Sequence, residues 1–498
     1  MKYLVVISML LSVCESYNIL VLLPYPGKSH HMVFEPILDE LTRRGHNLTV
    51  VSFFPSSQPN ARRRDVSLVG LAPLSVEVVD LKPYDDADFP GQNFLNQFTL
   101  IRDITRAGIQ LCEKLLNSPV FEEFVNAKGD YDVILLEHFN SDCMLGIVHE
   151  YQLPSIGLMS CALMPWTPSW VGGDDNPASF PSLMLPFTDK MSFLAKLQNT
   201  FDLLFYQYLH LYTSLSERKL LEIRLGRVLP PLADIGKNAS VVLVNTHHSL
   251  NGVRVLPPSV IEVGGIHLHN RTVQPLPKDL EEWVSEAKDG MILFSFGSLI
   301  KGSTLPPKRL DAILKAFARL PQRVVWKWEA QNIKYLPKNV LVQKWLPQYD
   351  LLHHPNCVAF ITHGGLLSLT EAVAAGVPAL IIPILGDQPG NAAYAKVAGV
   401  AEVLAFTEIS EEKLYQALNN VLTQEMQTRA KEFSNFWWNR PLSPMDTAIY
   451  YIEKTAKYGN LNMSSKARLL STPQLVFFNC LCYYSCECIL YRSQLLLL

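Results

Sequence analysis

The residues best suited to chemistry lie between Phe360 and Gln388, in the sequence FITHGGLLSLTEAVAAGVPALIIPILGDQ. Ser368, Thr370 and Glu371 fall in the first turns of the helix that we expect after the Gly-Gly pair. The free N–H groups and the positive dipole end of a helix N-terminus suit a phosphate. The stretch therefore predicts a site for a ligand that carries phosphate.

Two strands and the helix between them must position these side chains. Val358 to Thr362 is a short apolar run that fits a buried parallel strand, and the Gly-Gly turn after it lets the backbone approach a ligand closely. A Gly-Val-Pro turn ends the helix, and Ala379 to Ile384 forms the next strand. Asp387 and Gln388 come just past its carboxyl end, where open α/β sheets bind ligands.

The spacing of this stretch resembles the signature of the UDP-glycosyltransferases. The positions that match it are Thr362, His363, Gly365, Ser368, Glu371, Pro378, Pro383, Asp387 and Gln388. An ordinary strand–helix–strand unit with a Gly-rich turn explains the glycines and strands, but not His363, Glu371 and the Asp-Gln pair together. The chain is most similar to insect-type members, which usually take UDP-glucose. The resemblance implies an enzyme, a hexosyltransferase, that uses a UDP-sugar as co-substrate and needs no cofactor and no metal.

The resemblance also implies how the donor is held. Trp345 and Gln348, in the segment Trp-Leu-Pro-Gln, match residues that stack on uracil and read its edge. Glu371 would take the ribose hydroxyls, because a carboxylate suits a vicinal diol. Gly365 belongs to the turn that brings the backbone close to the ligand.

The remaining donor residues would hold the diphosphate and the sugar. Ser298 ends the strand that starts at Met291 and matches a serine that contacts the diphosphate. His363 and Ser368 would bond the phosphates as well. Asp387 and Gln388 would hold hydroxyls of the sugar.

The family places its general base at the position of His30, just after the first strand. His31 is adjacent and is the alternative assignment. A carboxylate should orient the base, and there are two candidates: Glu137 at the end of a predicted strand, and Asp142 five residues further on. We expect Asp142 in this role because its shorter side chain preserves the Asp–His geometry, and Glu137 stays open. The implied chemistry is direct displacement with inversion at the sugar.

The order of strands and helices predicts an α/β protein with two doubly wound parallel sheets. The resemblance implies the GT-B fold, in which two Rossmann-like domains face each other across a cleft for donor and acceptor. The expected segments are a signal peptide (1–16), an N-terminal acceptor-binding domain (17–263), a linker (264–278), a C-terminal UDP-sugar-binding domain (279–440), a helix that crosses back onto the N-terminal domain (441–458) and a degenerate candidate membrane anchor (475–491).

Composition and targeting signals indicate which partners and which cellular location to expect. The 498 residues carry a net charge of −3, so nucleic acid is not an expected partner. The N-terminal apolar segment predicts a secretory signal, and four Asn-x-Ser/Thr sequons fit a glycoprotein of the endoplasmic reticulum lumen or membrane. Leu475 to Tyr491 is short for a membrane span and contains Asn479 and Glu487, so an interfacial segment is the alternative.

The nine cysteines do not suggest a disulfide framework. Cys112, Cys143, Cys161 and Cys357 are expected as single, small core residues. Four more crowd the C-terminus, at Cys480, Cys482, Cys486 and Cys488, but their apolar setting argues against a zinc site.

The acceptor is expected to be a small lipophilic molecule such as a phenol, flavonoid, steroid or xenobiotic, which fits a role in detoxification. The segments from Pro83 to Thr105 and from Pro165 to Leu215 are aromatic and apolar and should line its pocket. The alternatives are an inactive UDP-sugar-binding relative, a UDP-sugar epimerase, and the use of a glucuronosyl donor. Oligomeric state stays open.

Overall fold

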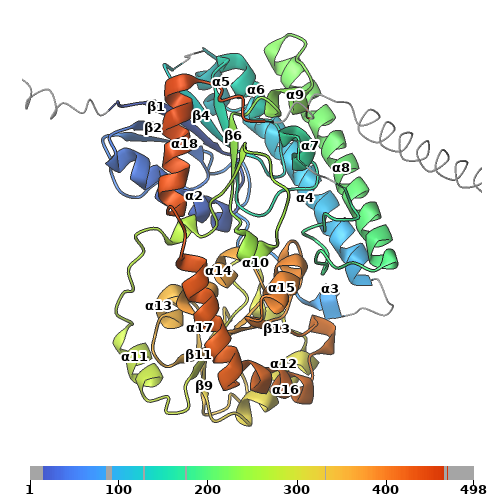
Figure 1. Cartoon of the computed structure of the whole chain (residues 1–498), viewed down its shortest axis with the longest axis vertical. Coiled ribbons are helices and arrows are strands. Elements are labelled where there is room, and N and C mark those ends of the chain that lie inside the picture. The colour runs from blue at the N-terminus through green and yellow to red at the C-terminus, as the bar shows by residue number, and fades with distance from the viewer. Residues whose placement is uncertain are drawn as a thin grey trace, which may run out of the picture.

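The computed structural model describes residues 15–85, 92–126, 129–173, 176–330, 333–464 and 468. These residues form two domains, each built on one parallel sheet with helices on both faces (Figure 1). The signal peptide up to Cys14, the candidate anchor at 475–491 and the four C-terminal cysteines lie outside the described residues.

The N-terminal sheet has the order β3-β2-β1-β4-β5-β6-β7. Its strands are β1 (Asn18–Leu23), β2 (Asn47–Ser52), β3 (Arg63–Ser67), β4 (Val133–Glu137), β5 (Ser155–Met159), β6 (Val241–Val244) and β7 (Val260–Glu262). The central strands are buried along almost their whole length, because helices cover both faces of the sheet. The chain order reverses between β1 and β4, which makes this pair the switch point of the sheet.

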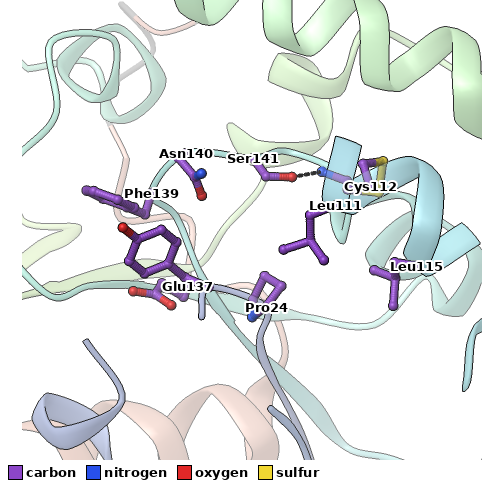
Figure 2. Close-up of a pocket in the computed structure, with 10 residues that line it drawn as sticks. Pro24, Leu111, Cys112, Leu115, Glu137, Phe139, Asn140 and Ser141 are labelled. Atoms are coloured by element: carbon purple, nitrogen blue, oxygen red, sulfur yellow. Dashed lines mark hydrogen bonds between the residues drawn. A yellow bond between two sulfur atoms is a disulfide. The ribbon is translucent and has the colours of Figure 1, made fainter. Parts of the chain in front are cut away.

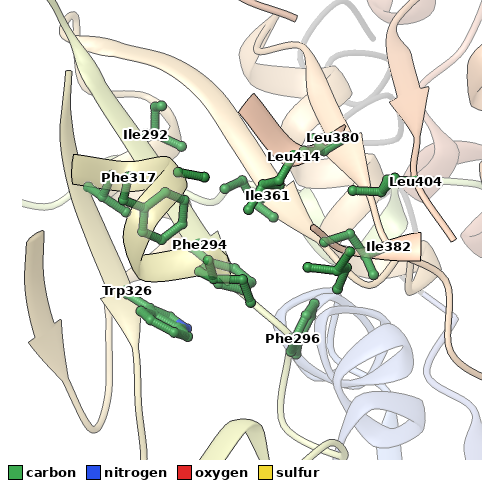
Figure 3. Packing of buried hydrophobic residues seen from close by; sticks show 14 of the residues in the cluster. Ile292, Phe294, Phe296, Phe317, Trp326, Ile361, Leu380, Ile382, Leu404 and Leu414 are labelled. Carbon is green, nitrogen blue, oxygen red and sulfur yellow. The ribbon is translucent and has the colours of Figure 1, made fainter. Parts of the chain in front are cut away.

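The C-terminal sheet has the order β10-β9-β8-β11-β12-β13. Its strands are β8 (Met291–Ser295), β9 (Arg323–Lys327), β10 (Val340–Gln343), β11 (Cys357–Thr362), β12 (Ala379–Ile381) and β13 (Ala401–Val403). Its switch point lies between β8 and β11. One face packs around Phe294, which stacks on Trp326 at a centroid distance of 4.7 Å and meets Phe317 edge-on (Figure 3).

Helices connect these strands. In the first domain they are α2 (Lys28–Arg43), α3 (Lys82–Asp85), α4 (Gln92–Leu116), α5 (Pro119–Asn126), α6 (Leu145–Tyr151), α7 (Thr167–Val171), α8 (Phe193–Leu225), α9 (Leu232–Gly236), α10 (His248–Asn251) and the 3-10 turn η1 (Ile266–Leu268). In the second they are α11 (Lys278–Ser285), η2 (Gly302–Thr304), α12 (Pro307–Ala318), α13 (Gln348–Leu352), α14 (Leu366–Ala375), α15 (Gln388–Val397), η3 (Phe406–Glu408), α16 (Glu411–Val421), α17 (Gln424–Trp438) and α18 (Pro444–Tyr458).

Two segments cross between the domains. Helix α18 leaves the second domain and packs on α2, β4 and β5 of the first. In the other direction, the segment before α3 runs along the loop after β8, where the N–H of Lys301 donates to the carbonyl of Val79 at 3.0 Å. Leu81 is fully buried in the core of the second domain. The domain ranges drawn from the sequence do not anticipate this second crossing.

The expectation for Cys112 and Cys143 is wrong, because these residues form a disulfide. Helix α4 packs beside the segment that follows β4, and the two Cα atoms lie 5.6 Å apart. Thirty-one positions separate the two cysteines in the sequence, so their proximity depends on a helix that the sequence pattern did not indicate. Cys161 and Cys357 are free and buried, as expected.

Candidate active site

The two switch points bring the predicted residues together. His30 lies on α2 after β1, and Glu137 ends β4, so both stand at the carboxyl edge of the first sheet. Ser298 follows β8 and His363 follows β11, at the corresponding edge of the second sheet. The two carboxyl edges face each other, and His30, Ser298 and His363 line the cavity between the domains.

His30 is held by groups from two neighbouring strands. Its Nδ1 lies 2.7 Å from Glu137 Oε1 and 2.6 Å from Ser160 Oγ. Glu137 ends β4 and Ser160 follows β5, and these strands are neighbours in the sheet. An ionised carboxylate only accepts hydrogen bonds, so the ring proton belongs on Nδ1 and Nε2 keeps its lone pair. This tautomer is the one that a general base requires.

Aromatic rings fix the orientation of the imidazole. Tyr25 and Phe139 pack on the His30 ring with centroids 4.4 and 4.3 Å away. Figure 2 shows Glu137, the last residue of β4, and Phe139 on the segment after it, with Cys112 of α4 across a small pocket. The disulfide therefore ties the segment that carries Phe139 to a long helix.

The preference for Asp142 as partner of His30 is wrong. Asp142 is buried and its Oδ2 lies 3.1 Å from Nε2 of His210 on α8. The segment after β4 turns away from the cleft before it reaches residue 142, whereas Glu137 sits at the strand end opposite β1. His31 also has a different partner, because its Nε2 lies 2.6 Å from Glu35 on the same helix.

On the opposite side of the cleft, His363 is enclosed by two glycines. A Cβ at Gly297 would lie 2.7 Å from His363 Cε1, and a Cβ at Gly365 would lie 2.5 Å from its Nε2. Gly297 also has φ +75°, a conformation that favours glycine. Burial lowers the pKa of His363 to about 4, so the ring is neutral at pH 7 and can bond a phosphate without adding charge.

Three of the predicted donor residues form one hydrogen-bonded group. The Gln348 amide donates to Ser368 Oγ at 3.0 Å and to Glu371 Oε2 at 2.6 Å. Arg271 donates to the other oxygen of Glu371 at 2.6 Å. Burial raises the pKa of Glu371, and the Arg271 charge opposes that rise.

Trp345 stands apart from that group and is 66% exposed. Its ring faces the first domain, where the Lys28 ammonium lies 5.2 Å from the ring centroid. A large, exposed aromatic face at the rim of a cleft is suited to stacking on a planar base.

Asp387 and Gln388 occupy the start of α15. Gln388 Oε1 accepts from the backbone N–H groups of Ile384 and Leu385 at 2.9 and 3.1 Å, which closes the loop before the helix. Asp387 accepts from Asn391 at 2.9 Å. Burial raises the pKa of Asp387, and the nearby His30 opposes this as a smaller effect.

A cavity of about 210 Å³ joins the two halves of the site. Of the predicted residues, those that line it are His30, Ser298, His363, Gly365, Ser368, Asp387 and Gln388. Glu137 lies behind His30, and Trp345, Gln348 and Glu371 extend the site beyond the cavity wall. No lysine or arginine is among the described residues that line the cavity.

A smaller, apolar cavity of about 40 Å³ adjoins the first. The two share four lining residues, Ile101, Ile104, Phe139 and Met184. Trp166 and His210 also line the smaller one, and their rings stack at 4.2 Å. Trp166 and the α4 residues belong to the segments expected to line an acceptor pocket.

Several residues of the site did not stand out in the sequence. Ser160 could have been found as the residue that follows a strand next to β4, once the strand order was known. Arg271 lies in the segment expected as a linker, and nothing in its local sequence indicates a contact with Glu371. Tyr25 and Lys28 lie between the end of β1 and His30, and their residue types alone did not indicate a place in the site.

Comparison with known proteins decides the family. Residues 19–473 match the family described as UDP-glucoronosyl and UDP-glucosyl transferase. The chain belongs to the UDP-glycosyltransferase family. UDP-glucosyltransferase 2 of Dactylopius coccus is 34% identical over 462 residues, covering 91% of this chain and 87% of that protein. Human UDP-glucuronosyltransferase 2B7 is 29% identical over 442 residues, covering 85% of this chain and 82% of that protein.

Solved structures confirm the fold of this UDP-glycosyltransferase. The glycotransferase of kitacinnamycin superposes with a TM-score of 0.59 at 17% identity, covering 88% of this chain and 99% of the other. CalG4, the calicheamicin glycosyltransferase, gives 0.58 at 17% identity, covering 89% and 100%. The expected GT-B architecture is therefore confirmed, as is the expectation of an enzyme that transfers sugar from a UDP-sugar.

Proposed function

We propose that this UDP-glycosyltransferase transfers glucose from UDP-glucose to a hydroxyl of a small lipophilic acceptor, with inversion at the anomeric carbon. The observation that carries the proposal is the placement of His30. Its Nδ1 is held by Glu137 and Ser160, and its ring lines the same cavity as Ser298, His363 and Asp387. A base and a phosphate-binding edge thus face one space.

The reaction follows from this placement. The acceptor O–H would give its proton to His30 Nε2 while its oxygen forms the new bond to the anomeric carbon. On the opposite face, the bond from that carbon to the diphosphate oxygen would break, and UDP would leave with the electron pair. Glu137 would stabilise the imidazolium, as a carboxylate does behind a catalytic histidine.

The leaving diphosphate would be held by dipoles and hydrogen bonds. Ser298, neutral His363 and the N–H groups at the start of α14 lie on the donor side of the cavity. UDP would stack its uracil on Trp345 and displace the Lys28 contact. Its ribose would meet Glu371, which Gln348 and Arg271 orient.

A neutral hexose suits the sugar subsite better than glucuronate. The carboxylate of glucuronate would need a cation, and the described residues that line the cavity include none. The Asp387 carboxyl group lines the same cavity, and its oxygens suit the hydroxyls of a neutral hexose better than a second carboxylate. The printed name of the Dactylopius glucosyltransferase supports the same choice.

The acceptor is proposed to be aromatic or alicyclic and largely apolar. Leu100, Ile101, Ile104, Leu183 and Met184 line the cavity beside His30. They would bury the body of the acceptor in apolar surroundings, while the imidazole of His30 meets its hydroxyl.

A lumenal location is proposed for the protein. The N-terminal segment reads as a secretory signal, and the Cys112–Cys143 disulfide fits an oxidising compartment. Attachment to the membrane belongs to the same proposal and is treated below.

The test is acceptor-dependent release of UDP by the purified chain. UDP-glucose and UDP-glucuronate are offered separately with a panel of phenols and flavonoids. We expect release with UDP-glucose, and a loss of at least 100-fold in His30→Ala with unchanged affinity for UDP. His31→Ala is the matched control, because His31 pairs with Glu35 and should be dispensable. Equal turnover with glucuronate would refute the sugar choice, and activity in His30→Ala would refute the base.

A further inference from the structure

Helix α8 (Phe193–Leu225) carries a long apolar stripe on its outer face. The exposed large side chains along it are Phe193, Leu194, Leu197, Phe201, Leu204, Tyr208, Leu211, Tyr212 and Leu215. Phe193 is 80% exposed and Tyr208 is 65% exposed. The helix lies at the outer edge of the N-terminal domain (Figure 1). Exposed apolar surface of this extent marks an interaction site.

The inner face of the same helix is polar, the reverse of an ordinary surface helix. Its buried residues include Asn199, Asp202, Thr213, Ser214 and Glu217. Asn199 donates to the carbonyls of Pro177 and Phe180 at 2.8 Å, and Glu217 accepts from the N–H of Asp142 at 2.6 Å. Asn199 and Glu217 thus hold the polar side of the helix inside the protein, and the apolar side is left to the surroundings.

The stripe is long and continuous enough to lie along an apolar boundary. Its residues recur every three or four positions, which keeps them within one face of the helix. From Phe193 to Leu215 it is about 33 Å long at 1.5 Å per residue. Among the exposed residues of this span, Gln198 is polar and none is charged. Lys219 follows one turn beyond the end.

We propose that α8 lies on a lipid surface, with this stripe in the boundary between headgroups and acyl chains. Apolar and aromatic side chains on one face, with lysine at the margin, are the composition of an interfacial helix. A second copy of the chain fits less well, because stable protein interfaces use roughly 20–30 residues a side, and the stripe offers far fewer.

The path of the chain supports a lipid surface. Arg468, the last described residue, donates to the carbonyl of Lys237, which caps α9, and α9 contacts α8. The following residues include the apolar run from Leu475 to Tyr491 and the final four leucines. That run is short for a span and contains Asn479 and Glu487, so it is a weak anchor alone. Two weak apolar contacts in one chain reinforce each other when both meet the same lipid surface.

This inference goes beyond sugar transfer and does not depend on it. Among the described residues, no helix is long and apolar enough to cross a bilayer, and α8 is proposed to lie along the surface.

The test places p-benzoylphenylalanine at position 204 of the full chain by amber suppression. The protein is irradiated with and without phosphatidylcholine vesicles, and the α8 peptide is analysed by mass spectrometry. The proposal expects the mass of one phospholipid on that peptide, only when vesicles are present. The same probe at Tyr335, which is 94% exposed in the C-terminal domain, should gain none.

Each other product overturns the proposal. A covalent dimer would assign the stripe to a second copy, and a crosslink to residues 469–498 would assign it to the chain's own C-terminus. Equal lipid labelling at position 335 would show nonspecific contact, and unlabelled peptide would show a face exposed to water.

A second measurement uses Phe201→Asp combined with Tyr208→Asp, whose side chains point outward. The unfolding temperature should stay within a few degrees of the parent. The lipid concentration for half-maximal vesicle flotation should rise at least ten-fold. An unchanged flotation curve in the folded variant would show that the stripe contributes nothing.

Discussion

At the scale of single residues, one member of the proposed catalytic pair was predictable from the sequence. His30 could be assigned because it follows the first strand of a chain with a recognisable donor signature. Its partner could not be assigned, because Glu137 and Asp142 are only five positions apart and the choice between them depends on where the backbone turns after the strand. The structure places Glu137 at 2.7 Å from His30 and Asp142 beside His210.

Glu137→Gln should lower kcat for glucosyl transfer by about 10²–10⁴-fold and leave UDP affinity unchanged. The amide keeps the contact to His30 but no longer stabilises the imidazolium. Asp142→Asn is the matched control and should keep kcat within ten-fold of the parent, since its partner is His210. Kinetics of UDP release measure both. A larger loss of kcat in Asp142→Asn than in Glu137→Gln would instead identify Asp142 as the partner of His30.

Gly297→Ala should weaken UDP binding at least ten-fold in calorimetric titration. The new Cβ would lie 2.7 Å from the His363 ring, and the ring or the strand end must shift. Gly226→Ala is the control, because Gly226 has a similar φ of +65° with no atom within 4 Å of an added Cβ. It bears the backbone strain without the clash. Equal affinity for UDP in both variants would show that the position of the His363 ring does not matter for donor binding.

At the scale of elements, the core strands were the most predictable part. The apolar runs that became β1, β5 and β11 are continuous and short, as strands buried on both faces must be. The sequence pattern alone predicts two helices here, near Lys190–Leu215 and Leu220–Leu225, but α8 is one continuous helix. Its buried polar face obscured the usual pattern. Edge strands β3 and β13 and helix α4 were missed, because tertiary contacts rather than local pattern define them.

Glu217 links α8 to the segment after β4 and should make stability fall as pH rises. Burial raises its pKa to about 8, above the unfolded value of 4.5. The folded state therefore holds a proton that the unfolded state releases between these values. The stabilisation is fully present below about pH 4.5 and is lost as pH rises through 8.

Glu217→Gln should remove this dependence. In the parent, Glu217 accepts from the Ser141 hydroxyl and from the N–H of Asp142. The glutamine oxygen can still accept from the N–H of Asp142, and its NH2 group can donate to Ser141 Oγ. The difference in unfolding temperature, variant minus parent, should grow from pH 5 to pH 8. A constant difference across that range would mean that Glu217 is ionised in the fold.

The disulfide should stabilise the segment that carries Phe139. Replacing both Cys112 and Cys143 by Ser should cost about 3–4 kcal/mol, given the length of the loop that the bond closes. Urea denaturation measures the change. Dithiothreitol should lower the midpoint of the parent and leave that of the double variant in place. A parent midpoint that dithiothreitol does not move would contradict the assignment.

At the scale of the whole molecule, the division into two domains followed from strand and helix alternation, and the resemblance implied the return of the last helix. The crossing of the segment before α3 was not predicted. The segment Glu77–Asp85 belongs to the first half of the chain and packs on the second domain. The N–H of Glu77 donates to the carbonyl of Ser298 at 2.8 Å. Arg309 on α12 pairs with Asp85 at 2.5 Å. The edge of the second sheet that carries Ser298 is thus partly supported by a segment of the first half of the chain.

Leu81→Ala should therefore loosen the second domain rather than the first. Leu81 is fully buried among residues of the β8 and α12 region, and removing its side chain should cost about 2–5 kcal/mol. Hydrogen exchange by mass spectrometry should show faster exchange in peptides covering Met291–Ala318. Peptides covering Asn47–Ser67 in the first sheet should keep the parent rate. Val66→Ala, in the core of the first domain, is the control and should give the opposite distribution. Faster exchange confined to the first sheet in Leu81→Ala would show that the segment does not couple the domains.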